Sequence, residues 1–332
     1  MMQIKSIAII GGGSWATALV KIFSEKTDIT IDWWMRNQEA VDHILAFGHN
    51  PNYISSIAFD KNVKPSTDLL SIIQKNTIII LATPAAFLSG QLSILPKNAF
   101  ENKYIATSIK GIIPETYEVV GQYLINHWGI SAHQLAVITG PCHAEEVALE
   151  KLSYLTVASV NNDFANTLND LIVCRYIKTK ITEDVFGVEY AAVLKNVYAI
   201  ACGICHGLGY GDNFQAVLVS KSLSEMEQFL VDCHTQYRDV KENAYLGDLL
   251  VTAYSQFSRN RTFGNMIGKG YTVKSAQMEM NMIAEGYFST KTMYKINESI
   301  GSNMPILKAV YEIIYEQQNP KKIFTALEPL LS

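Results

Sequence analysis

The chain has 332 residues, 48% of them hydrophobic, and a net charge of −4 from 27 basic and 31 acidic side chains. This length suits two domains, and the balanced charge gives no bulk electrostatic reason for binding nucleic acid or a membrane surface. No stretch approaches the roughly 20 apolar residues that span a bilayer, no signal peptide is expected, and the five cysteines fit a reducing cytoplasm rather than a disulfide framework.

The first 20 residues predict a nucleotide-binding strand, turn and helix. Residues 4–10 form a nearly all-apolar run, typical of a strand buried in a parallel sheet, and an apolar pattern of helical spacing follows from Trp15. Between them, Gly11-x-Gly13-x-x-Ala16 matches the dinucleotide fingerprint in its Ala-ended form. Gly11 permits the tight turn, Gly13 lets a pyrophosphate approach the backbone, and the helix start favours the anion. An ordinary strand-turn-helix corner is the alternative.

A second strand is predicted over residues 29–35, directly before Arg36. In NAD-preferring domains an acidic residue about 20 positions after the glycines binds the ribose 2′-hydroxyl. Here Arg36 stands 20 positions after Ala16. A cation at this place would pair with a 2′-phosphate, so we favour NADPH over NADH as the cofactor. The alternative is a solvated surface arginine.

Strands continue to alternate with helices as far as residue 184. They are expected near Lys64 and at residues 77–82, 104–107, 135–139, 156–160 and 174–179. Lys110 follows one of these strands and Gly140 follows the next, and ligands bind at the carboxyl ends of parallel strands. For Lys110 a solvated loop charge is the alternative. We predict an α/β Rossmann-type domain, with a mostly parallel doubly wound sheet, over residues 1–184.

Beyond residue 185 the strand signals vanish, which predicts an all-α domain over residues 185–332. Its first helix places Lys195 in an apolar stripe with Val188, Ala192, Ala199 and Cys202. A buried lysine is costly unless it is paired or its pKa is lowered, and a lowered pKa suits proton transfer near neutral pH. A lysine at the edge of the stripe that reaches solvent is the alternative.

Two glycine-rich turns are predicted in this second domain, at residues 206–213 and around Gly247. Further along, Ser258, Arg259 and Asn260 stand in a dense set of hydrogen-bond donors suited to phosphate. A solvated helix end is the alternative for this segment.

One cysteine pattern, Cys202-x-x-Cys205-His206, matches the spacing of haem c attachment. That chemistry requires export, and the pattern lies inside an apolar helical segment. We therefore interpret both thiols as buried structural cysteines, with a haem attachment site or a redox dithiol as the alternatives.

Taken together, the motifs resemble those of the bacterial NAD(P)-dependent glycerol-3-phosphate dehydrogenases along nearly the whole chain. The resemblance rests on GGGSWATALV, SIKGI, TGPCHAEEVA, VLKNVYAIACGICHGLGYGDN, GDLLVTAYSQFSRNRTFG and AEG. It implies reversible hydride transfer between NAD(P)H and dihydroxyacetone phosphate, giving sn-glycerol 3-phosphate for phospholipid synthesis. Members commonly form dimers, so a homodimer is an expectation from the resemblance, as are a small-molecule substrate and no nucleic-acid partner.

The resemblance also implies roles for single residues. Lys195 matches the catalytic proton donor and acceptor, Lys110 a lysine that contacts substrate and cofactor, and Asp248 is expected to orient Lys195 or a substrate hydroxyl. The expected substrate contacts are Lys110, Gly140, Cys142, Lys195, Asp248, Ser258, Arg259 and Asn260. The expected cofactor contacts are Gly11, Gly13, Ser14, Trp15, Arg36, Lys110, Ala144, Arg259, Ile283 and Glu285. Cys142 departs from the usual Ser or Thr and is a poorer hydrogen-bond donor. No metal is expected, because two lysines supply the electrophile.

Two other functions stay open on the sequence. The first is a two-domain reductase that acts on a hydroxy acid, against which the Arg259 cluster favours a phosphorylated substrate. The second is a non-catalytic NADPH-sensing module, which would leave Lys195 and Lys110 without a role.

Overall fold

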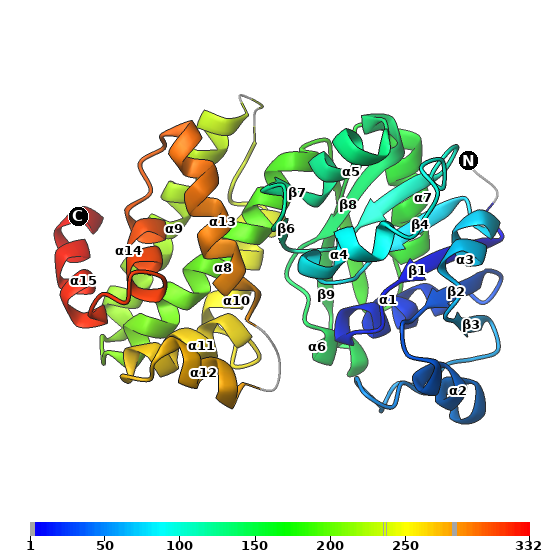
Figure 1. Cartoon of the computed structure of the whole chain (residues 1–332), viewed down its shortest axis with the longest axis horizontal. Helices are drawn as coiled ribbons and strands as arrows, with labels where there is room; N and C mark the ends of the chain where they lie inside the picture. The colour runs from blue at the N-terminus through cyan, green and yellow to red at the C-terminus, as the bar shows by residue number, and fades with distance from the viewer. Residues whose placement is uncertain (1–3, 235, 237, 281–283) are drawn as a thin grey trace. The chain divides into compact units, whose positions relative to one another are not determined.

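The computed structural model describes residues 4–234, 236, 238–280 and 284–332 (Figure 1). The chain divides into two compact units. The first unit comprises Met1–Ile113 and Glu118–Phe186, and the second comprises Pro114–Tyr117 and Gly187–Ser332.

The first unit is built on an eight-stranded sheet with the order β10-β9-β8-β5-β4-β1-β2-β3. Its strands are β1 (Ser6–Ile10), β2 (Thr30–Trp34), β3 (Val63–Ser66), β4 (Ile78–Leu81), β5 (Tyr104–Thr107), β8 (Leu135–Thr139), β9 (Ser153–Ala158) and β10 (Ile177–Thr182). Neighbouring strands are parallel along the sheet from β3 through β2, β1, β4 and β5 to β8. Strand β9 is antiparallel to β8 and parallel to β10. The strand order reverses between β1 and β4, where ligands bind in doubly wound sheets. The predicted Rossmann-type sheet is confirmed.

Helices of this unit pack on the sheet and complete its core. They are α1 (Ser14–Ser24), α2 (Gln38–Phe47), α3 (Leu69–Lys75), α4 (Ala85–Leu92), α5 (Val120–Trp128), α6 (Ala144–Ala148) and α7 (Asn162–Ile172), with the 3-10 turn η1 (Ala132–Gln134) and the hairpin strands β6 (Ile112–Ile113) and β7 (Glu118–Val119). Side chains of Asn37, Asp68 and Asn161 cap α2, α3 and α7 by accepting backbone N–H groups. The apolar runs of β1 and β4 are fully buried, as strands covered on both faces must be.

The last two strands begin and end at other residues than the sequence predicts. The strand expected at Cys174 begins at Ile177, because Cys174 lies in a turn whose N–H donates to the Ile177 carbonyl at 3.2 Å. The strand expected from Thr156 begins at Ser153, whose N–H donates to the Tyr176 carbonyl at 2.9 Å. The two strands are separated in the sequence by helix α7. Pairing between them thus determines the residue at which each strand begins.

Every regular element that the structure describes in the second unit is helical, which confirms the all-α prediction (Figure 1). These elements are α8 (Val185–Gly207), α9 (Asp212–Cys233), η2 (Asn243–Gly247), α10 (Asp248–Tyr254), α11 (Arg259–Gly268), α12 (Val273–Glu279), α13 (Glu285–Ile300), α14 (Pro305–Ile314), α15 (Pro320–Leu327) and η3 (Glu328–Leu331). The turn predicted at residues 206–213 separates α8 from α9. The turn predicted around Gly247 is wrong, because η2 is a π-helical turn that continues into α10 and Gly247 has helical angles (φ −60°, ψ −48°).

Helix α8 is more deeply buried than the predicted apolar stripe suggests. By length and composition this helix is long and apolar enough to cross a membrane, which the sequence analysis did not recognise. In the structure, 94% of its most apolar 18-residue stretch is buried. Leu194 and Tyr198, which lie outside the stripe, are as inaccessible as Ala199 within it. A helix that is apolar all round is a core helix in such surroundings.

Candidate active site

The turn after β1 has the geometry that a dinucleotide-binding loop requires. Gly11 has φ +140°, and a Cβ there would lie 2.7 Å from the Ala82 carbonyl oxygen, so the position demands glycine. A Cβ on Gly13 would meet no atom within 4 Å. Gly13 is also the N-cap of α1, and no side chain caps the first N–H groups of the helix at this position. These features fit a bound pyrophosphate.

The next residues of the turn add to this fit. Ser14 and Trp15 open α1 and are partly exposed, whereas Ala16 is fully buried. The Trp15 indole Nε1 is buried and has no hydrogen-bond partner among the described residues. A buried donor of this kind calls for an acceptor, which a bound cofactor can supply.

Arg36 lies at the end of β2, beside this turn. The Gly11 N–H donates to the Trp34 carbonyl at 3.1 Å, which brings the end of β2 against the turn. Arg36 follows two residues later and is exposed. Asn37 then caps α2 by accepting the Ala40 N–H at 3.2 Å.

Lys110 and Gly140, predicted from separate motifs, are in direct contact. Lys110 Nζ donates to the Gly140 carbonyl oxygen at 2.9 Å, because each residue follows one of the paired strands β5 and β8. Gly140 has φ +120°, and a Cβ there would lie 2.8 Å from the Tyr154 carbonyl oxygen. Cys142 is half-buried against the core of the first unit, and the buried Ala144 begins α6.

In the second unit, Lys195 on α8 and Asp248 at the start of α10 form a buried ion pair. Lys195 Nζ donates to Asp248 Oδ1, and the side chains are only 6% and 1% exposed. The pairing explains how a lysine is tolerated in the apolar helix, since a buried charge must be compensated.

The predicted phosphate-binding residues lie at the start of α11. Ser258 is its N-cap, and its Oγ accepts the Arg261 N–H at 3.3 Å. Arg259 is exposed, whereas Asn260 is buried. Asn260 Nδ2 donates to Asn196 Oδ1 at 2.9 Å, and its Oδ1 accepts the Gly286 N–H at 2.8 Å. Asn196 directly follows Lys195, so this bond ties the start of α11 to the helix that carries the buried lysine.

A glycine crossing that the sequence reading missed holds α8 against α11. A Cβ on Gly203 would lie 2.2 Å from the Arg261 carbonyl oxygen, and one on Gly264 would lie 2.1 Å from that of Ile200. Gly207 and Gly268 make the same kind of approach one turn further along. The signal was present as two four-residue glycine spacings, 203/207 and 264/268, which allow close helix contact.

Glu285, a predicted cofactor contact, is the first residue of α13 and is partly buried. Ile283, predicted for the same role, lies outside the described residues.

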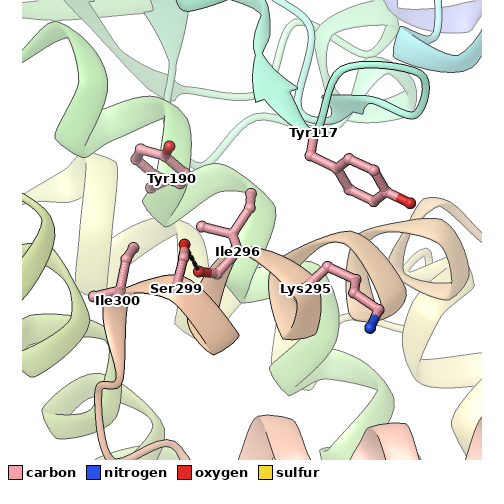
Figure 2. Close-up of a pocket in the computed structure, with 6 residues that line it drawn as sticks. All are labelled: Tyr117, Tyr190, Lys295, Ile296, Ser299 and Ile300. Carbon is pink, nitrogen blue, oxygen red and sulfur yellow. Dashed lines mark hydrogen bonds between the residues drawn. The ribbon is translucent and has the colours of Figure 1, made fainter.

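A cavity of about 550 Å³ in the second unit contains none of the predicted site residues. Its walls are Tyr117, Tyr190, Lys295, Ile296, Ser299 and Ile300. Figure 2 shows Tyr190 on α8 facing the α13 side chains, where Ser299 Oγ donates to the Ile296 carbonyl at 2.7 Å. Lys295 is paired with Glu298 at 2.8 Å, so its charge is already compensated.

The Cys202 and Cys205 thiols are buried and do not form a disulfide. Burial raises the pKa of each thiol to about 12. Neither thiol is therefore a thiolate near neutral pH, in agreement with a structural role.

Residues 6–165 match the model of the NAD-dependent glycerol-3-phosphate dehydrogenase N-terminus, and residues 184–325 match that of the C-terminus. Glycerol-3-phosphate dehydrogenase [NAD(P)+] 2 of Salinibacter ruber is 33% identical over 97% of this chain and 94% of its own. The chain belongs to the NAD-dependent glycerol-3-phosphate dehydrogenase family. It is thus an NAD(P)-dependent oxidoreductase.

Solved structures agree with this membership. The crystal structure of glycerol-3-phosphate dehydrogenase from Coxiella burnetii has a TM-score of 0.90 and 28% identity, covering 98% of both chains. A ketopantoate reductase from Ralstonia eutropha has a TM-score of 0.61 and 11% identity, covering 96% of this chain and 99% of its own, which is a likeness of fold alone. The chain therefore shares only its fold with that reductase, whereas its sequence places it in the glycerol-3-phosphate dehydrogenase family.

Proposed function

We propose that this chain catalyses the reversible NAD(P)H-dependent reduction of dihydroxyacetone phosphate to sn-glycerol 3-phosphate. The observation that carries the proposal is the buried Lys195–Asp248 pair, tied through Asn196 to the Ser258–Arg259–Asn260 segment. This chain's second unit thereby joins a proton donor to a set of phosphate ligands, the two groups that a phosphorylated ketone needs.

Lys195 acts as the general acid in this proposal. As negative charge develops on the carbonyl oxygen of the substrate, Lys195 Nζ gives that oxygen a proton, and in the reverse reaction it takes the proton back. Asp248 accepts a hydrogen bond from the same nitrogen and so holds it in one position. Lys110, held by the Gly140 carbonyl, stabilises the developing charge.

The phosphate binds at the start of α11. Its ligands are the Arg259 guanidinium, the N–H groups at the helix start and the second N–H of the Asn260 amide, whose first N–H is used by Asn196. Ser258 and Cys142 complete the proposed substrate contacts. Fixing the phosphate sets the position of the reacting carbon.

The first unit binds the cofactor. When bound, NAD(P)H supplies the hydride that adds to the carbonyl carbon. The turn from Gly11 to Trp15 binds the pyrophosphate, and Arg36 pairs with a 2′-phosphate, so NADPH is the preferred form. Ala144, Arg259, Ile283 and Glu285 are the remaining proposed cofactor contacts.

The proposal also includes the domain bounds, the cellular location and the assembly of the protein. The cofactor domain extends over residues 1–184 and the substrate domain over residues 185–332. The protein works in the cytoplasm as a homodimer and supplies sn-glycerol 3-phosphate for phospholipid synthesis.

The test is the loss of near-ultraviolet NAD(P)H absorbance with dihydroxyacetone phosphate, run separately with NADH and NADPH. Rapid oxidation with a bias to NADPH is expected. A folded protein that binds the cofactors and oxidises neither would overturn the proposal, and a panel of 2-keto acids would then separate a hydroxy-acid reductase from a sensor.

A further inference from the structure

The carbonyl groups of the glycine turn are each held by a donor from elsewhere in the first unit. The Trp33 indole Nε1 donates to the Gly11 carbonyl at 2.6 Å. Asn50 Nδ2 donates to the Gly12 carbonyl at 3.3 Å. The Thr17 hydroxyl donates to the Gly13 carbonyl at 3.0 Å, and the Thr17 N–H donates to it at 2.9 Å.

Asn50 connects two of these three contacts. Its Nδ2 also donates to the Thr17 hydroxyl at 2.9 Å, so the amide, the hydroxyl and the Gly13 carbonyl form one chain of hydrogen bonds. Its Oδ1 accepts the Asn52 N–H at 3.0 Å. The side chain is completely buried, and these bonds fix the direction of its amide.

The segment that carries Asn50 is itself anchored at both ends. Gly48 accepts the Phe59 N–H at 2.7 Å, which closes the loop between them. The Phe59 ring packs edge-on against Trp33, with ring centres 5.3 Å apart. The loop thus holds both Asn50 and the indole that contacts Gly11.

Held carbonyls determine where the neighbouring N–H groups point. No cis peptide bond occurs among the described residues, and in a trans peptide the C=O and the following N–H point in opposite directions. Anchoring the carbonyls of Gly11, Gly12 and Gly13 therefore turns the N–H groups of Gly12, Gly13 and Ser14 the other way. A Cβ on Gly13, the middle one of these three residues, would meet no atom within 4 Å, so a ligand has room to approach there.

We infer that Asn50, acting through Thr17 and the Gly12 carbonyl, is a positioning residue that presets the glycine turn for the cofactor pyrophosphate. The inference rests on the proposed function, since it requires that the turn binds NAD(P)H. As a positioning residue, Asn50 does not touch the cofactor. It lowers the entropy cost of ordering three N–H donors when the cofactor binds, and this preorganisation increases the affinity for the cofactor.

The test compares Asn50→Ala and Thr17→Val with Thr17→Ser, which restores the hydroxyl. Affinity for NADH and NADPH is measured by nicotinamide fluorescence, and KM values are measured for cofactor and dihydroxyacetone phosphate. ADP-ribose, which keeps the pyrophosphate and lacks the nicotinamide, serves as an inhibitor. Asn50→Ala and Thr17→Val should each lower the affinity for NAD(P)H and for ADP-ribose by roughly tenfold, which corresponds to the loss of about one hydrogen bond. The KM for dihydroxyacetone phosphate should not change, and Thr17→Ser should bind like the wild type.

Asn76→Ala is the matched control. Asn76 is an equally buried asparagine of the first unit whose Nδ2 donates to Asp32 Oδ2 at 2.9 Å and to the Ile72 carbonyl at 2.8 Å, away from the turn. It should lower the free energy of unfolding and leave cofactor affinity intact.

Wild-type affinity in Asn50→Ala and Thr17→Val, or an equal loss in Asn76→Ala, would overturn the inference alone. A wild-type protein that binds neither cofactor would overturn the proposed function, and the inference with it. If Asn50→Ala fails to fold, the Thr17→Val and Thr17→Ser pair decides the outcome.

Discussion

Lys195 and Asp248 are 53 residues apart in the chain, yet they form a buried ion pair in the second unit. Helix α8 brings the lysine and the first turn of α10 brings the carboxylate. Removing one partner of such a pair leaves the other charge buried without compensation, which destabilises the fold. Any test of this site must therefore measure the free energy of unfolding separately from the turnover rate.

Lys195→Met should abolish the proposed proton transfer and also destabilise the fold. We expect kcat to fall by about 10²–10⁴-fold, the usual contribution of a general acid. The free energy of unfolding should drop by about 3–5 kcal/mol, because the buried Asp248 loses the cation paired with it. The double variant Lys195→Met/Asp248→Leu should regain stability in denaturant unfolding without regaining turnover. Recovery of activity in the double variant would rule out Lys195 as the acid.

Gly264→Ala should force α8 and α11 apart. The new Cβ would lie 2.1 Å from the Ile200 carbonyl oxygen, a backbone atom that cannot turn aside. We expect a loss of roughly 3 kcal/mol in the free energy of unfolding, with a higher KM for dihydroxyacetone phosphate because Asn260 moves with α11. Gly90→Ala, in helix α4 with nothing within 4 Å, is the control and should be neutral or stabilising. Equal stability of the two variants would contradict the close crossing.

Arg36→Ala should change cofactor choice and leave catalysis with NADH intact. The proposed role of this exposed cation is to pair with the 2′-phosphate, which NADH lacks. Its loss should therefore lower kcat/KM for NADPH by about tenfold or more. Lys61→Ala removes another exposed charge at the amino end of the strands, before β3, whereas Arg36 lies at their carboxyl end, and this change should affect neither cofactor. An unchanged NADPH to NADH ratio in Arg36→Ala would show that the arginine is only solvated.

Glu225 on α9 should make stability depend on pH. Burial raises the pKa of its carboxyl from 4.5 to about 7, although the N–H groups of Ile306 and Leu307, at 2.7 and 3.0 Å, act in the lowering direction. The folded state therefore holds a proton that the unfolded chain releases between these pH values. The contribution of Glu225 to the free energy of unfolding should be greatest below pH 4.5. It should be lost as the pH rises through about 7, and the loss is on the order of 3 kcal/mol.

Denaturant unfolding of wild type and Glu225→Gln from pH 5 to pH 8 measures this effect. The glutamine stays neutral, so its stability should vary less across the window. Glu227→Gln, on the exposed side of the same helix, should keep the wild-type dependence. A slope in Glu225→Gln as steep as that of the wild type would contradict the assignment.

Local patterns in the sequence determined much of the first unit. Gly11 and Gly140 are required by positive φ and by backbone atoms that leave no room for a Cβ, and both were recognised from their motifs. The contact of Lys110 with Gly140 follows from strand order, because two residues after neighbouring parallel strands meet at one edge. The apolar run of β1 and the break after residue 184 also marked where the strands give way to helices.

Only the tertiary structure decided which distant groups meet. The family resemblance left open whether Asp248 orients Lys195 or a substrate hydroxyl, and the fold pairs it with Lys195. The Asn196–Asn260 link and the glycine crossing depend on how helices pack, which periodicity within one helix does not specify. Asn50 reads as an ordinary loop residue until folding buries it behind the glycine turn. The physical reason is range: a sequence motif reports the backbone angles and burial of its own segment, whereas a hydrogen bond between segments exists only once the whole core has brought them together.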